Sequence, residues 1–195
     1  MKNITLVSFF LIAIVACKPF DSRLLVSQKE SFSPKLPAME KVIEDNFTYL
    51  VTPTGQFVGP GPQDASTLFE REIIEKMTDP YTDKKGYLVL KINTIEHMTK
   101  TGFGAYFLPF IVMNFPLSVT TTDIEIKIEV LNSNKRLIGS YSGNSKNKMT
   151  ARLYENNYRA ADMARTSYVT AMKEALEIAK GTMQADLARL NGLLQ

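Results

Sequence analysis

The stretch that decides the fold is Asp123–Leu131, with the sequence DIEIKIEVL. Apolar and charged residues alternate along it, with Ile124, Ile126, Ile128 and Val130 on one side and Asp123, Glu125, Lys127 and Glu129 on the other. This period of two residues predicts a β-strand that has one face in a core and the other in solvent. Residues 132–135 have the composition of a turn, so residues 136–142 are expected to return as the partner strand of a hairpin.

Outward from this hairpin, the sequence predicts two further strands and two helices. The strands are Tyr87–Glu96, half buried at Leu88, Leu90 and Ile92, and Phe47–Val51. Thr67–Thr78 predicts a short helix that Asp79-Pro80 ends, and residues 52–66 before it, rich in proline and glycine, predict a loop.

Residues 154–190 predict a long C-terminal helix. A 3.6-residue period supports it, with the stripe Tyr168, Met172, Ala175, Ala179, Met183 and Leu190. Gly181 inside this helix leads us to expect a bend or a close packing contact there. Together the elements predict an α+β fold: a mixed or antiparallel sheet of about four to five strands, packed with one short and one long C-terminal helix.

Composition excludes several classes of protein. The 195 residues suit one globular domain, and a net charge of +3 is far from the clustered positive charge of a nucleic-acid-binding protein. A single cysteine excludes an internal disulfide and a thiolate metal cage, and the sequence points to no metal or cofactor. We expect no catalytic residue either. His97 is a lone histidine at a strand end, and Glu125 and Glu129 lie ~13–14 Å apart along one strand, too far for a glycosidase carboxylate pair.

The N-terminus has the form of an export signal. Met1-Lys2-Asn3 is positive, and the apolar run 4–16 is shorter than the ~20 residues of a transmembrane helix. The run ends Ile14-Val15-Ala16-Cys17, which resembles the lipobox of bacterial lipoproteins. The resemblance implies cleavage between Ala16 and Cys17, and a lipid on Cys17. A buried cysteine after an ordinary signal peptide is the alternative interpretation.

This resemblance sets the expected organisation. Residues 1–16 are a signal peptide, 17–36 a lipidated N-terminus and tether, and 37–195 a single α+β domain. Because Lys18 is not aspartate, the sorting pattern of lipoproteins favours the outer membrane, facing the periplasm. The order of elements over residues 45–190 also resembles a group of envelope lipoproteins that includes the curli-secretion lipoprotein and the amino-terminal domain of TolB. That likeness implies a non-enzymatic role in envelope assembly or transport.

The segment Thr101–Thr122 contains no charged residue. Its prolines, Pro109 and Pro116, argue against a membrane-spanning helix. One interpretation is a core-packed strand with a covered loop. The other is an exposed docking loop whose contacts are aromatic: Phe103, Tyr106, Phe107, Phe110 and Phe115. We expect the flanks near Phe103 and Leu117 in the core and the tip around 108–110 exposed.

Two functions follow from these expectations. The first is a membrane-anchored scaffold or adaptor that binds an envelope protein or a second copy of itself through the aromatic segment. The second is a carrier with an enclosed apolar cavity for a lipid or a similar ligand. An enzyme is the least expected class.

Overall fold

Four strands form one mixed sheet in the order β1-β4-β5-β6. The computed structural model describes residues 19–26, 32–45, 50–52, 55–57, 61–106, 113–152 and 160–194. The strands of the sheet are β1 (Glu40–Asp45), β4 (Gly86–Thr101), β5 (Ser118–Asn132) and β6 (Leu137–Ala151). β1 runs parallel to β4, and the other neighbours are antiparallel. β2 (Leu50–Thr52) and β3 (Gly55–Phe57) form a separate antiparallel pair.

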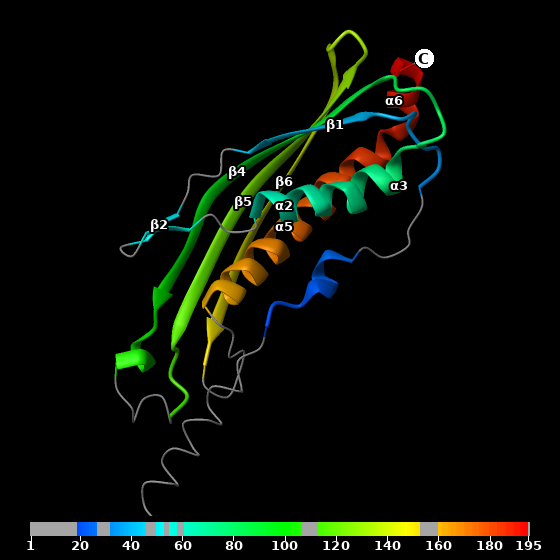
Figure 1. The fold of residues 1–195 in the computed structure, drawn as a ribbon. Coiled ribbons are helices and arrows are strands. Elements are labelled where there is room, and N and C mark those ends of the chain that lie inside the picture. Colours follow the sequence, from blue (N-terminus) through cyan, green and yellow to red (C-terminus); the bar gives the residue numbers. More distant parts are fainter. Residues whose placement is uncertain are drawn as a thin grey trace, which may run out of the picture.

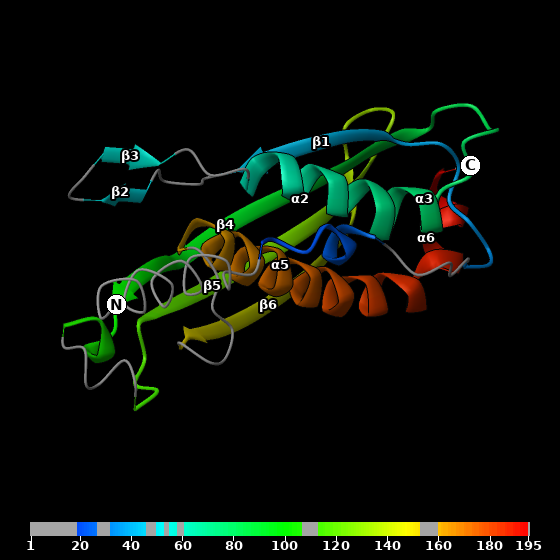
Figure 2. The ribbon, with the colours of Figure 1, turned by 60° about the horizontal axis from the view of Figure 1, so that its bottom comes forward.

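The helices cover one face of this sheet (Figures 1 and 2). One helical segment comprises α2 (Gly61–Phe69), a π-helical turn η2 (Glu70–Ile74) and α3 (Glu75–Met77). The other comprises α5 (Ala160–Ala185) and α6 (Leu187–Leu194). Short 3-10 turns are η1 (Ser22–Leu25) and η3 (Phe103–Tyr106). No helix of the described residues lies on the opposite face of the sheet. The predicted α+β fold is confirmed.

The core lies between the sheet and the two helical segments. All four apolar residues of the alternating stretch in β5 are buried, as are Leu88, Leu90 and Ile92 of β4. The stripe predicted for the C-terminal helix is buried against them in full. Burial of each large apolar side chain contributes ~1.5–3 kcal/mol, so the two-residue period of β5 and the 3.6-residue period of α5 together drive this packing.

Several predicted boundaries differ from those of the structure. The short helix begins at Gly61, because Pro62 suits a first helical turn, where its missing N–H costs no hydrogen bond. The proline that indicated a loop therefore lies inside the helix. The sequence analysis missed β1, and most of the strand predicted at 47–51 lies outside the described residues. The strands β4, β5 and β6 are also longer than predicted.

Gly181 makes no close contact and does not interrupt α5. It is exposed, and a Cβ built on it meets no atom within 4 Å. The helical segment is interrupted at Asp186 instead. The Asp186 carboxylate accepts hydrogen bonds from the Tyr141 hydroxyl (2.5 Å) and from the Arg189 guanidinium (2.7 Å). The interruption thus coincides with a side chain that connects α5, α6 and β6.

The segment predicted as a tether packs on the domain where it is described. Phe20, Leu24 and Leu25 pack against the core, and η1 contacts both α2 and α5 (Figure 2). Leu36 is fully buried, and its backbone N–H donates to the Met77 carbonyl at 2.8 Å. These apolar side chains bury their area on the helices, so the described residues of this segment pack on the domain predicted for residues 37–195.

Candidate functional site

Large apolar side chains are exposed where β4 connects to β5, at the end of the molecule opposite the C-terminus (Figure 1). We call four of these residues the apolar tip: Phe103, Tyr106, Met113 and Phe115. Their exposed fractions are 61%, 69%, 67% and 38%. Met98 of β4, on the approach to the tip, is 41% exposed. Aromatic side chains of this size are ordinarily buried, so a group of them in solvent indicates a contact surface.

Two buried glycines position the tip. The backbone N–H of Gly102 donates to the Leu117 carbonyl, and that of Gly104 donates to the Pro116 carbonyl, both at 2.8 Å. A Cβ at Gly102 would lie 2.1 Å from the Pro116 oxygen, so only glycine allows the two chain segments to come this close. Phe103, between the two glycines, therefore lies on the exposed side, with its ring edge-to-face on Phe115 at 6.3 Å between centroids.

This geometry corrects one expectation and leaves the docking interpretation a prediction. The flank near Phe103 does not enter the core, because the close approach of backbones at Gly102 and Gly104 fills that space. Phe103, Tyr106 and Phe115 lie together at one end of the sheet, as the docking interpretation requires. Phe107 and Phe110 lie outside the described residues, as do the predicted tip at 108–110 and the lipid attachment residue Cys17 with Ala16.

A buried polar network lies below the tip, between β4, β5 and α5. His97 Nδ1 is 2.8 Å from the Thr122 hydroxyl, which is 2.8 Å from the Ser167 hydroxyl. Burial lowers the pKa of His97 below its usual value of 6.5. Thr122 and Ser167 are fully buried, so a substrate does not reach these hydroxyls. The network holds α5 to the sheet, as expected of a hydrogen-bonded histidine.

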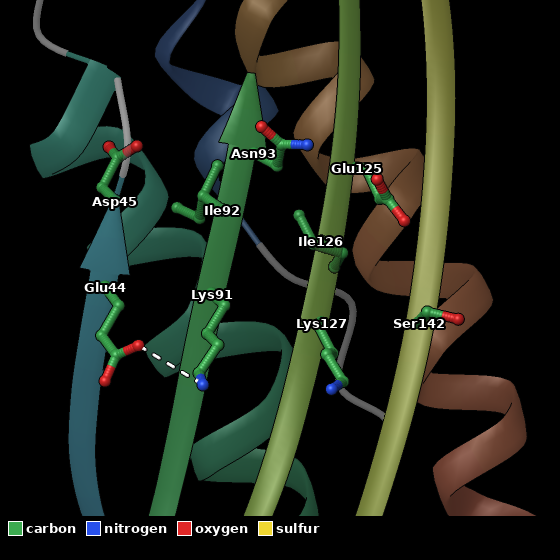
Figure 3. Close-up of a pocket in the computed structure, with 9 residues that line it drawn as sticks. All are labelled: Glu44, Asp45, Lys91, Ile92, Asn93, Glu125, Ile126, Lys127 and Ser142. Carbon is green, nitrogen blue, oxygen red and sulfur yellow. Dashed lines mark ion pairs between the residues drawn. The ribbon is translucent and has the colours of Figure 1, made fainter. Parts of the chain in front are cut away.

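The helix-free face of the sheet carries a shallow hollow of about 730 Å³ (Figure 3). Charged side chains from three strands line it, and they pair with one another. Lys91 lies 3.0 Å from Glu129 and 3.6 Å from Glu44, and Lys127 lies 2.9 Å from Glu129. Hydrogen bonds from Lys127 and Lys91 lower the pKa of Glu129. Glu125 is exposed on the same face. Glu125 and Glu129 thus belong to an ion-paired, solvent-facing surface.

A buried charged cluster at the π-helical turn was not predicted from the sequence. Glu72 lies 2.6 Å from Lys76 and 3.6 Å from Lys180, and all three side chains are almost completely buried. Burial by itself raises the pKa of Glu72, but the hydrogen bond from Lys76 and the lysine charges outweigh it and lower the pKa. The helical spacing of Glu72 and Lys76 was visible in the sequence. Their burial was not, because η1 and Lys180 come from distant parts of the chain.

The described residues contain neither a metal site nor a membrane-spanning helix. Among them, no group of histidine, cysteine, aspartate and glutamate side chains is arranged to hold a metal ion. None of their helices is both long and apolar enough to cross a membrane.

Comparisons with known proteins give little beyond this geometry. No known protein family matches the chain, and no curated protein is similar to it. A solved structure described as a putative lipoprotein from Caulobacter crescentus CB15 matches with a TM-score of 0.36 and 12% sequence identity. The match covers 77% of this chain and 90% of that chain. At this level of similarity, no argument about function rests on the match.

Proposed function

We propose that this protein is a lipid-anchored lipoprotein of the bacterial cell envelope that acts as a non-enzymatic scaffold or adaptor. The anchor is a lipid on Cys17 after cleavage at Ala16, on the outer membrane facing the periplasm. The Ile14–Cys17 lipobox supports the anchor. The observation that carries the adaptor role is the apolar tip, whose exposed side chains give the anchored domain a second contact surface.

The structure favours an adaptor over a carrier of apolar ligands. Side chains of the core fill the space between the sheet and the helices. Charged residues line two hollows of the described residues: Lys91, Lys127 and Glu125 the hollow of Figure 3, and Glu72, Lys173 and Glu177 another. A lipid-binding cavity is lined mainly by apolar side chains. Four of the exposed large apolar side chains gather at the tip, where they suit contact with a surface.

The anchor is tested by Cys17→Ser in the full chain, expressed in a bacterial host. We expect the variant to lose incorporation of labelled palmitate and to remain uncleaved at Ala16. A Ser variant that still incorporates the fatty acid would show that the lipid is elsewhere, and the assignment of Cys17 would be withdrawn.

The contact surface is tested by photo-crosslinking in cells. A photoreactive residue replaces Met113 at the tip or, as a control, Tyr81, which is 96% exposed near the start of β4, at the opposite end of the sheet. We expect adducts from position 113 and none from position 81. Equal yields at the two positions would mean that the tip is not a preferred contact surface, whatever the partner is.

A further inference from the structure

We infer that the apolar tip contacts an anionic membrane surface, the surface of the same bilayer that holds the lipid anchor. This inference rests on the proposed function, because it names the surface that the tip contacts. Three features of the structure support it: the kind of side chain at the tip, the charges around the tip, and the place where the N-terminal segment joins the domain.

The side chains of the tip are those that favour a membrane interface. Phenylalanine and methionine bury apolar area in the acyl region, and tyrosine combines an apolar ring with a hydroxyl that remains at the headgroups. Phe103, Tyr106, Met113 and Phe115 lie on the turn η3 and on the short stretch before β5. Backbone hydrogen bonds at Gly102 and Gly104 brace the base of this tip. The aromatic rings are thus held in solvent by the fold before any contact is made.

The charges that the described strands carry near the tip are positive. On the sheet, the acidic side chains end at the paired residues Glu96 and Asp123. At ~3.4 Å per residue, Asp123 is about 17 Å from the start of β5 at Ser118. Over that distance the described strands carry only basic side chains: exposed Lys100 and Lys148 and, just after β6, Arg152. We call Lys100 and Lys148 the basic collar.

The basic collar lies on one face of the sheet. Lys148 pairs with Thr121 in register, Thr121 pairs with Met98, and Lys100 pairs with Val119 two residues further along. Alternation along a strand therefore places Met98, Lys100 and Lys148 together on the helix-free face. On the described helical layer, Asp64 and Asp162 lie beside Arg165, whose guanidinium pairs with Asp64 at 2.8 Å. Basic residues behind an apolar insertion suit anionic lipid headgroups.

The opposite end of the sheet has no such pattern. Tyr81 and Leu137 are exposed apolar residues there, and the basic residues Lys84, Lys85, Lys135 and Arg136 are mixed with Asp79 and Asp83. Both signs of charge are present at that end, whereas the described strands near the tip carry basic side chains alone.

The N-terminal segment joins the domain in the half of the sheet that carries the tip. The Arg165 guanidinium lies over the Phe20 ring at 4.0 Å. Arg165 is two residues before Ser167, which bonds to Thr122 of β5. Phe20 is therefore held near the level of Thr122, four residues from the tip end of β5. Cys17 precedes Phe20 by three residues, a span of at most ~11 Å of extended chain. A lipid on Cys17 and the apolar tip can enter the same membrane.

The test measures binding of the mature chain, residues 17–195 with Cys17→Ser, to lipid vesicles by flotation. This chain contains every residue of the core, which extends from Leu36 to Leu194, and Phe20 packed on it. We expect binding to vesicles of phosphatidylcholine with phosphatidylglycerol, weaker binding to phosphatidylcholine alone, and a decrease with salt. Phe103→Ser with Tyr106→Ser, and separately Lys100→Glu with Lys148→Glu, should each weaken binding to the anionic vesicles at least tenfold.

Matched controls use the opposite end of the sheet. Tyr81→Ser removes an exposed aromatic residue, and Lys84→Glu with Lys135→Glu reverses two lysine charges. Both controls should bind the vesicles as the unsubstituted chain does. Thermal unfolding should show that all variants are folded, since substitutions at exposed positions change stability by ~0.5 kcal/mol or less.

Fluorescence gives a second readout. The chain has no tryptophan, so Tyr106→Trp introduces a single tryptophan at the tip, which can be excited selectively at 295 nm, and Tyr81→Trp a control. Anionic vesicles should shift the emission of the tip variant to the blue, brominated lipids should quench it, and the control should not respond. The inference is overturned if the mature chain fails to bind anionic vesicles or if the tip and collar variants bind unchanged. If the tip crosslinks in cells to a protein or to a second copy of the chain, and the chain does not bind vesicles, the proposed function stands. The partner of the tip is then that protein and not the bilayer.

Discussion

The same substitution, glycine to alanine, should have opposite effects at Gly143 and Gly181. Gly143 lies on β6 under α5. A Cβ built on it would be 2.0 Å from the backbone oxygen of Ala175 and 3.1 Å from the backbone nitrogen of Ala179. Gly181 lies in α5 with its Cβ position in open space. Neither glycine has a positive φ angle, so packing alone distinguishes them.

The magnitudes follow from these contacts. At Gly143 both partners are backbone, which has no rotamer to change, so β6 and α5 must separate by more than 1 Å to reach an ordinary contact of 3.4 Å. Overpacking costs ~1–3 kcal/mol in general, and we expect the upper end of this range here. Gly181→Ala, at an exposed position of α5, should instead stabilise the folded chain by ~1 kcal/mol.

Thermal unfolding of the mature chain, followed by circular dichroism, measures both changes. For a domain of this size ~1 kcal/mol corresponds to ~2–4 °C, so Tm should fall by ~6–12 °C for Gly143→Ala and rise by ~2–4 °C for Gly181→Ala. Chemical denaturation gives the free energies directly. A loss below ~1 kcal/mol for Gly143→Ala would show that α5 does not lie directly on β6, and the reasoning about this contact would fail.

Three further predictions concern the sheet and the two buried polar clusters. Ile126→Asp should cost several kcal/mol and unfold the domain, whereas Lys127→Asp should cost ~1 kcal/mol; equal losses in thermal melts would refute the assigned faces of β5. Because burial lowers the pKa of His97 in the folded chain, stability should be complete above the unfolded pKa of ~6.5 and should decrease as the pH falls below it; His97→Gln should lack this decrease in denaturation curves between pH 7.5 and 5.5. Glu72→Gln leaves Lys76 and Lys180 buried without the Glu72 charge and should cost ~3–5 kcal/mol by urea denaturation, while a cost below ~1 kcal/mol would show that the cluster is hydrated.

The predicted fold was recovered because its main signals are local. The alternation along Asp123–Leu131 requires one buried face, and a one-residue change of register would place Ile126 in water and Lys127 in the core. The stripe from Tyr168 to Leu190 likewise requires a helix with one buried side. Each pattern is complete within a single segment, so no knowledge of the neighbouring segments was needed to interpret it.

The candidate site was only partly predictable. The uncharged segment with Phe103 and Phe115 was recognised as unusual, but the sequence did not show which of its aromatic residues enter the core. That choice depends on the register of β4 with β5 and on the close approach at Gly102 and Gly104. The basic collar could not be predicted for the same reason. Lys100 and Lys148 lie at the same end of one sheet face only because β4 and β6 both pair with β5.

By itself, the sequence determined the class of the fold, the faces of its main strand and long helix, and the lipobox that motivates the proposed anchor. Only the tertiary structure decided that Phe103 is exposed, that the segment from Phe20 packs on the helices, and that Glu72 lies buried among lysines. The physical reason is the range of the interactions. Periodicity records what each segment must bury, whereas exposure and charge clustering depend on which distant segments come together to bury it.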